Sequence, residues 1–266
     1  MAENTPGSTR KVVADHLYLD RGPKEASSRC DANTQFAAVD LCDEMLKHLQ
    51  LQPGQKMVDV GCGSGQHLVR FTEAVGSEGS AHGYDFSPKA VENTRKRGMP
   101  ADVADGANLP LENESVDALS SSFSMYYLPD VNATLTEWHR VVRPGGRVVI
   151  SGPADDTNKE LYEFHQAIVG VGPADTDLMA LGFVQALPEP AAKAGFQECK
   201  VETFTNPIQF PTDEAFLDYW MNTSIFARTV EDDKRDEIRA KGKAHLADKS
   251  APFVITKRVA VAICIR

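Results

Sequence analysis

A glycine-rich segment, VDVGCGSG at residues 58–65, is the first candidate for chemistry. It stands between a short apolar run and a stretch with helical spacing, where glycines permit a tight turn and close approach of a ligand to the backbone. A dinucleotide fingerprint GxGxxG would need glycine at position 66, which is Gln66. The lysine of a phosphate-binding P-loop is also missing. The segment therefore indicates a ligand-binding turn that needs no phosphate.

Two carboxylates stand at or just after the ends of later strands. Asp85, in GYDFSP, follows Gly65 by twenty residues and could accept hydrogen bonds from both hydroxyls of a ribose. Enzymes that use nicotinamide cofactors have the same arrangement. Asp85 therefore indicates that an adenosine is bound, but it does not indicate which reaction is catalysed. Asp105 begins the segment DGANLP, and a structural role in a turn is its alternative.

These segments occupy residues 56–151 in the order and spacing of class I S-adenosylmethionine-dependent methyltransferases, which the sequence resembles. VDVGCGSG is similar to motif I of that family, and the resemblance is closest to small-molecule enzymes of the ubiquinone-biosynthesis type. It implies S-adenosylmethionine as cofactor, with Asp85 on the ribose and Asp105 on the adenine amino group. The cofactor-binding residues that it implies are Asp59, Gly61, Cys62, Gly63, Gly65, Asp85, Phe86, Asp105, Gly106 and Ser122.

The chain departs from the family at two places. It has Ala-Asp-Gly at residues 104–106 where relatives often have Gly-Asp-Ala, and Tyr126-Tyr127 where many have His-His. A phenol shields a sulfonium through its ring face, but its ordinary pKa of about 10 makes it a poor base at neutral pH. Core packing is the alternative for both tyrosines.

Methyl transfer from a sulfonium is an in-line displacement that needs mainly alignment and desolvation, with a base only for a protonated acceptor. We expect His165 and Tyr126 as catalytic candidates, ahead of His16 and Glu163. The expected substrate-lining residues are Tyr18, Tyr127, Phe216 and Trp220. For the aromatic residues of this set, burial of a helix against the sheet is the competing interpretation.

Alternating strand and helix signals surround these residues and favour βαβ units with a parallel sheet. We expect an α/β fold with a doubly wound, seven-stranded, mostly parallel, Rossmann-like sheet, a helical cap and an antiparallel last strand. The expected strands are 56–60, 81–84, 101–104, 116–121, 147–151, 201–204 and 253–265. The expected parts are an N-terminal helical lid segment 1–50, a cofactor-binding core 51–207, a cap insertion 208–250 and the final strand 251–266.

Composition narrows the partners. The net charge of −10 argues against nucleic acid and against an anionic membrane as partners. A small-molecule substrate is what the family resemblance implies. The five cysteines lack metal-ligand spacing, fit a reducing cytoplasm and suggest neither a metal site nor paired thiols. We expect a cytoplasmic monomer or homodimer without a metal.

The main prediction is a methyltransferase acting on O, N or C of a small molecule. An S-adenosylmethionine-binding protein, or an enzyme that uses this cofactor without transferring methyl, is the first alternative. An NAD-dependent oxidoreductase is less favoured because of Gln66.

Overall fold

One seven-stranded sheet organises the computed structural model of the protein, which describes residues 35–174, 178, 180–247 and 253–266. The strand order is β3-β2-β1-β4-β5-β7-β6. Strands β1 to β5 are parallel, and β7 is antiparallel to both β5 and β6, which confirms the predicted fold. The strands are β1 (Lys56–Val60), β2 (Ser80–Asp85), β3 (Ala101–Val103), β4 (Val116–Ser122), β5 (Val142–Pro153), β6 (Glu198–Phe210) and β7 (Phe253–Ile265).

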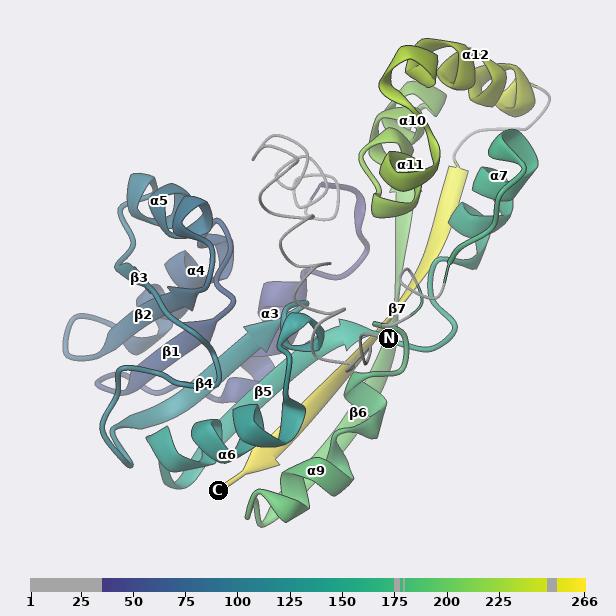
Figure 1. Cartoon of the computed structure of the whole chain (residues 1–266). Coiled ribbons are helices and arrows are strands. Elements are labelled where there is room, and N and C mark those ends of the chain that lie inside the picture. The colour runs from purple at the N-terminus through teal and green to yellow at the C-terminus, as the bar shows by residue number, and fades with distance from the viewer. Residues whose placement is uncertain (1–34, 175–177, 179, 248–252) are drawn as a thin grey trace, which may run out of the picture.

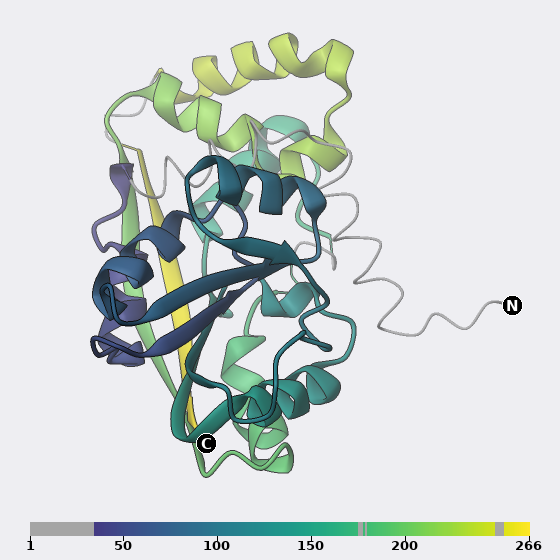
Figure 2. The same ribbon diagram turned by 90° about the vertical axis from the view of Figure 1, so that its left-hand side faces the viewer.

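Helices cover both faces of the sheet (Figures 1 and 2). Those described are α3 (Leu41–Leu49), α4 (Gln66–Val75), α5 (Pro88–Lys96), α6 (Val131–Val141), α7 (Lys159–Val169), α9 (Pro188–Lys193), α10 (Asp213–Met221), α11 (Ser224–Thr229) and α12 (Arg235–Leu246). Short 3₁₀ turns are η1 (Met125–Tyr127), η2 (Val184–Ala186) and η3 (Asp232–Lys234). In these described ranges, no helix combines the length and apolar character needed to cross a bilayer.

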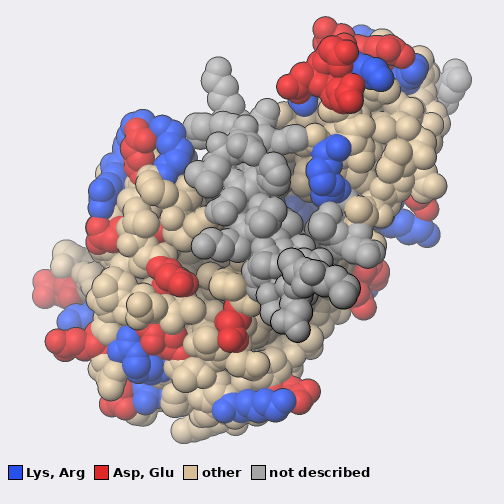
Figure 3. Space-filling view, in the orientation of Figure 1, with Lys and Arg blue, Asp and Glu red and all other residues tan. Residues whose placement is uncertain are grey.

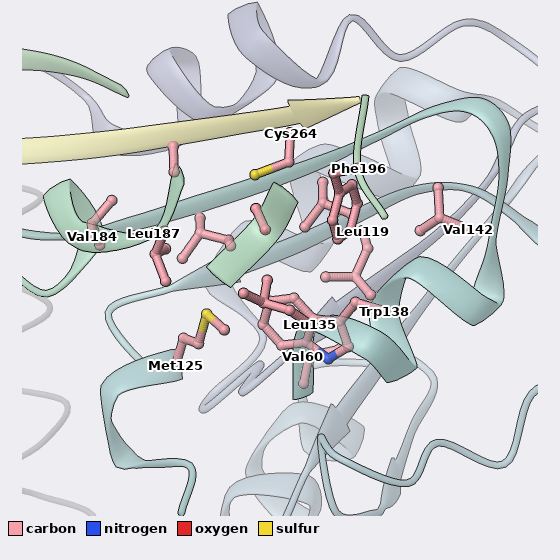
Figure 4. Close-up of a cluster of buried hydrophobic side chains, with 14 of the residues drawn as sticks. Val60, Leu119, Met125, Leu135, Trp138, Val142, Val184, Leu187, Phe196 and Cys264 are labelled. Carbon is pink, nitrogen blue, oxygen red and sulfur yellow. The ribbon is translucent and has the colours of Figure 1, made fainter. Parts of the chain in front are cut away.

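Two apolar clusters hold the helices to the sheet. On one face α6 and α9 pack around Trp138, whose indole N–H donates to the carbonyl of Gly106 at 2.9 Å. Figure 4 shows Trp138 and Leu135 of α6 beside Val60 of β1. On the opposite face, α3 and α4 contribute Met45, Leu49, Leu68 and Phe71. Apolar residues at helical spacing therefore fix the strand ends, where the candidate residues lie.

The two C-terminal strands are longer than the core needs. β6 and β7 pair continuously from Glu198↔Ile265 to Phe210↔Phe253. In contrast, only residues 259–265 of β7 pair with β5. The sequence predicts only residues 201–204 for β6, because its polar alternation beyond the core is a weak signal. The extra length forms a two-stranded ribbon that runs past the carboxyl end of β5 toward α7 and α10–α12 (Figure 1). We call these four helices the cap.

The cap has an aromatic core of its own. The ring of Phe164 on α7 makes edge contacts with Phe216 at 4.8 Å and Trp220 at 4.9 Å between centroids. Residues 212–228 form two helices, because α10 ends at Met221 and α11 begins after its N-cap, Thr223. Its hydroxyl oxygen accepts the N–H of Phe226, as an N-cap does.

One cysteine pair corrects the expectation of dispersed thiols. Cys199 on β6 and Cys264 on β7 are register partners and form a disulfide. Their separation of 65 positions in sequence conceals a contact that only the antiparallel pairing creates. Cys42 and Cys62 are the free cysteines of the described part.

Candidate cofactor site

Four loops meet at the carboxyl edge of the sheet. The order β3-β2-β1-β4 places the ends of these strands next to one another. All ten residues expected to bind the cofactor lie there, in the loop 61–65, at residues 85–86 and 105–106, at Ser122, and at Asp59 within β1. The carboxyl edge is where parallel α/β sheets bind ligands.

Asp85 joins the first two of these loops. Its side chain is 4% exposed, and its two oxygens accept the N–H groups of Gly63 and Ser87, each at 2.9 Å. Burial raises the pKa of Asp85, and the two backbone N–H groups oppose that rise. The carboxylate is therefore held in one orientation, while its remaining lone pairs are chemically able to accept ligand hydroxyls.

The glycine loop takes a shape that most residues resist. Gly61, Gly63 and Gly65 have φ of +77°, +57° and +75°, in the left-handed region. A Cβ on Gly61 would lie 2.3 Å from the side chain of Ser124, and one on Gly65 would lie 2.8 Å from Thr94. A Cβ on Gly63 would meet nothing within 4 Å. Gly61 and Gly65 therefore serve packing, and Gly63 faces open space beside Asp85.

Asp59 is a buried carboxyl beneath this loop. It is 3% exposed and accepts the hydroxyl of Ser120 on β4 at 2.6 Å. Burial raises the pKa of Asp59 to about 7, the charge of Asp85 adds to this, and the Ser120 hydrogen bond opposes it. A cationic ligand nearby would favour the ionised form, so the site is suited to a positively charged partner.

The thiol of Cys62 has a packing role in the loop. It is 8% exposed and lies 3.8 Å from the hydroxyl oxygen of Thr94. Burial is the main cause that raises the pKa of Cys62, which keeps the thiol protonated and unreactive.

Three hydroxyl residues support the site and were missed by sequence reasoning. Besides Ser120, Thr94 donates to the carbonyl of Gly63 at 2.9 Å, and Ser124 donates to the carbonyl of Val60 at 3.0 Å. The only signal was the serine-rich end of β4, and serine there is equally common in ordinary turns. The roles of these three residues become visible only when the register between the strands is known, and a single sequence does not give that register.

The third loop offers a more exposed carboxylate. One oxygen of Asp105 accepts the N–H of Ala107 at 2.9 Å, and the residue is exposed. Gly106 packs under Leu128, and its carbonyl holds the Trp138 indole. Phe86 is 38% exposed directly after Asp85, so an aromatic ring stands at the same edge.

Beyond β4 the chain turns sharply. The hydroxyls of Ser122 and Ser151 lie 2.9 Å apart, which links the ends of β4 and β5. Phe123 follows with φ of +53°, a conformation that costs a residue with a side chain about 1–3 kcal/mol. The ammonium of Lys257 on β7 lies 5.2 Å from the centre of the Phe123 ring.

The two tyrosines lie at this same edge. Their ring centroids are 4.6 Å apart, and Tyr126, which is 6% exposed, contacts Phe183 at 6.2 Å. A Cβ on Gly152, near the end of β5, would come within 3.5 Å of the Tyr126 ring. The structure therefore puts both phenols on the β4–β5 side of the edge.

The other expected residues lie elsewhere. His165, Phe216 and Trp220 are 0% exposed within the cap, where Phe216 stacks on Phe253 at 3.9 Å. This burial favours packing over a pocket wall for the two aromatic residues, and it places His165 away from the four loops. Tyr18 and His16 lie outside the described residues. Within the described ranges, no group of three or more His, Cys, Asp or Glu side chains could hold a metal ion.

Comparisons with known proteins agree with this geometry. Residues 58–150 match the family described as "Methyltransferase domain". A demethylmenaquinone methyltransferase of Staphylococcus epidermidis is 32% identical over 129 residues, 46% of this chain and 54% of that protein. The chain thus spans about half the length of the curated relatives it matches.

Solved structures share the fold. A SAM-dependent methyltransferase of Aquifex aeolicus matches with TM-score 0.55 and 16% identity, over 92% of this chain and all of that one. The Haemonchus contortus phosphoethanolamine N-methyltransferase 2, in complex with S-adenosyl-L-methionine, matches with TM-score 0.60 and 15% identity, over 95% of this chain and 59% of that one.

Gly61→Ala and Gly63→Ala are matched variants, because both add the same strain of left-handed backbone, about 1–2 kcal/mol. Gly61→Ala also collides with Ser124, so we expect its free energy of unfolding to fall by about 1–3 kcal/mol more. Gly63→Ala should remain folded but weaken binding of S-adenosylhomocysteine. Urea unfolding and calorimetric titration measure the two effects. Equal losses of stability, with undiminished binding to Gly63→Ala, would contradict this division of roles.

The raised pKa of Asp59 gives stability a defined pH dependence. The folded chain keeps a proton that the unfolded chain releases between the usual value of 3.8 and about 7. The contribution of Asp59 is therefore full below that window and is lost as pH rises through it, by up to about 1.4 kcal/mol per pH unit. Asp59→Asn should remove this slope from the free energy of unfolding, measured with urea across the window. Parallel slopes for the two proteins would refute the assignment.

Proposed function

We propose that this chain, which carries a methyltransferase domain of the class I S-adenosylmethionine-dependent type over residues 58–150, transfers a methyl group from S-adenosylmethionine to a small molecule. One observation carries the proposal. The buried Asp85 carboxylate, fixed by Gly63 and Ser87, stands beside a glycine loop whose face at Gly63 is open. This pairing is suited to a ribose next to a second group that approaches the backbone closely.

The residues present fit that cofactor better than a dinucleotide. The side of the loop at Gly63 has room for a ligand, while Gln66 stands where a dinucleotide fingerprint has its third glycine. The exposed Asp105 and Phe86 flank Asp85 and offer an acceptor and a ring face for a base. The buried Asp59 favours a cationic ligand over a pyrophosphate.

The reaction asks little more of the protein than alignment and exclusion of water. When bound, the cofactor supplies a methyl group that its sulfonium already activates. The loop and Asp85 would hold it on the β1–β2 side. Tyr126, Tyr127 and Phe183 would exclude water on the β4–β5 side, where the acceptor has to approach. Tyr126, once ionised, is the proposed proton acceptor for substrates that arrive protonated.

The acceptor atom is proposed only as O, N or C of a metabolite or natural product. The relatives that name an acceptor align over less than half of this chain, or share only its fold. The cap lies outside the matched domain, and acceptor choice is expected to depend on it.

Calorimetric titration with S-adenosylmethionine, S-adenosylhomocysteine and NAD tests the cofactor assignment. We expect both sulfur compounds to bind and NAD not to bind. Asp85→Ala should weaken the binding at least about tenfold, because hydrogen bonds to a charged group are worth about 1.5–3 kcal/mol each.

Asp102→Asn is the matched control for that experiment. Asp102 lies on the neighbouring β3, is exposed and pairs with Arg95 at 2.6 Å, so its loss should leave binding unchanged. Thermal unfolding of both variants establishes that they are folded. Binding of NAD alone, or equal weakening in both variants, would overturn the assignment.

A further inference from the structure

A closed chain of hydrogen bonds inside the cap fixes the protonation state of His165. The indole N–H of Trp220 donates to Nδ1 of His165 at 3.0 Å. An indole nitrogen is only a donor, so Nδ1 carries no proton. The other ring nitrogen, Nε2, lies 2.9 Å from Oγ1 of Thr229, whose own hydrogen goes to the carbonyl of Ile225 at 2.7 Å. Nε2 therefore carries the proton and donates it to Thr229.

These groups come from three helices. His165 is on α7, Trp220 is on α10 and Thr229 is the last residue of α11. The ring thus connects two helices of the cap to a third, and its 0% exposure means that water takes no part in the connection.

Helix α7 is rooted at the carboxyl edge of the sheet. The N–H of Asn158, which precedes α7, donates to the carbonyl of Thr256 at 3.1 Å. The N–H of Arg258 donates to the hydroxyl of Thr157 at 2.8 Å. Whatever holds α10 and α11 to α7 therefore sets their place relative to the end of β5, which Figures 1 and 2 show beneath the cap.

We propose that His165 is a positioning residue, a latch that holds α10 on α7 only while its ring is neutral. Protonation would put an N–H on Nδ1 that faces the N–H of Trp220, so the shared hydrogen bond would be lost. A buried positive charge would also form in an apolar cluster. The significance for acceptor binding rests on the proposed function, whereas the latch itself does not.

The charged groups of the surrounding helices do not replace the lost bond. On α7, Lys159 pairs with Glu163 at 3.7 Å, and both side chains are well exposed. On α10, Asp218 pairs with Arg239 of α12 at 2.9 Å. The remaining ionisable residues of these elements include Asp213, Glu214, Arg228, Arg235, Asp236, Glu237, Lys241, Lys243 and His245.

Several of these residues contact rings of the cap or pair with one another. Arg235 lies 5.2 Å over the ring of Phe226, which itself contacts the His165 ring at 6.4 Å. The ring of His245 makes an edge contact with Phe164 at 5.6 Å between centroids, and Glu214 pairs with Lys243 and Arg239. Figure 3 shows acidic and basic side chains gathered at the outer end of the cap.

The sign of the pH effect follows from these contacts. The latch is complete while the His165 ring is neutral and opens as falling pH protonates it. While the ring is neutral both bonds hold, and when it is protonated α10 is released first, because the Trp220 bond is the one lost, whereas Nε2 keeps the proton that it donates to Thr229 on α11.

Nuclear magnetic resonance of the indole N–H groups in the full chain tests the latch without a cofactor. The chain has two tryptophans, and Trp138, bonded to Gly106, is an internal control. From pH 8 to pH 5 we expect the Trp220 indole resonance to shift and the Trp138 resonance to stay. The amides of α10 should lose at least about tenfold in protection against hydrogen exchange, corrected for intrinsic rates, relative to those of α6.

His165→Gln is the diagnostic variant, because an amide can accept from Trp220 and donate to Thr229 without titrating. It should keep the cap folded and abolish the pH response, whereas His245→Gln should retain it. An unmoved Trp220 resonance in the wild-type chain would overturn the proposal even if His165→Gln failed to fold. So would an unchanged response in a folded His165→Gln. Failure to bind S-adenosylmethionine would instead count against the proposed function alone.

Discussion

The carboxylate of Asp85 is the constraint on which the candidate site depends. It is buried, yet it accepts one backbone N–H from the loop after β1 and one from the start of α5. Those two bonds tie the glycine loop to the end of β2 and set the side of Gly63 that remains open. Asp59 and Ser120 brace the same loop from below by joining β1 to β4. The geometry of the site thus depends on the register between the strands and not on the glycine loop alone.

Much of this arrangement follows from the sequence. Strand β1, the loop, the end of β2 and the N-cap at Ser87 have strong local signals, so Asp85 and the glycines were predicted in place. Ser120, Thr94 and Ser124 were not, because their partners lie on other strands and helices. The disulfide between Cys199 and Cys264 was missed for the same reason. His165, Phe216 and Trp220 show a different limit, since an amphipathic pattern does not distinguish a pocket wall from a core.

The structure has two parts, the sheet core and the cap, and the ribbon formed by β6 and β7 connects them. The core, of which residues 58–150 match the methyltransferase domain, carries the candidate cofactor residues at the edge of the parallel strands. The cap has an aromatic core of its own around Phe164 and is attached by β6, β7 and α7. The apolar cluster of the cap also includes Ile208 and Phe210 of β6 and Ile255 of β7, so the cap packs on the far ends of these two strands. Acceptor selection is expected to reside at the junction, near Tyr126 and Tyr127.

The most direct test of the central claim is the change in backbone amide resonances of the isotope-labelled chain on addition of S-adenosylhomocysteine. We expect the largest resonance changes at the loop 61–65, at residues 85–87 and at residues 105–107, and smaller changes at the end of β4. Changes confined to the cap, or to the opposite edge of the sheet, would contradict it.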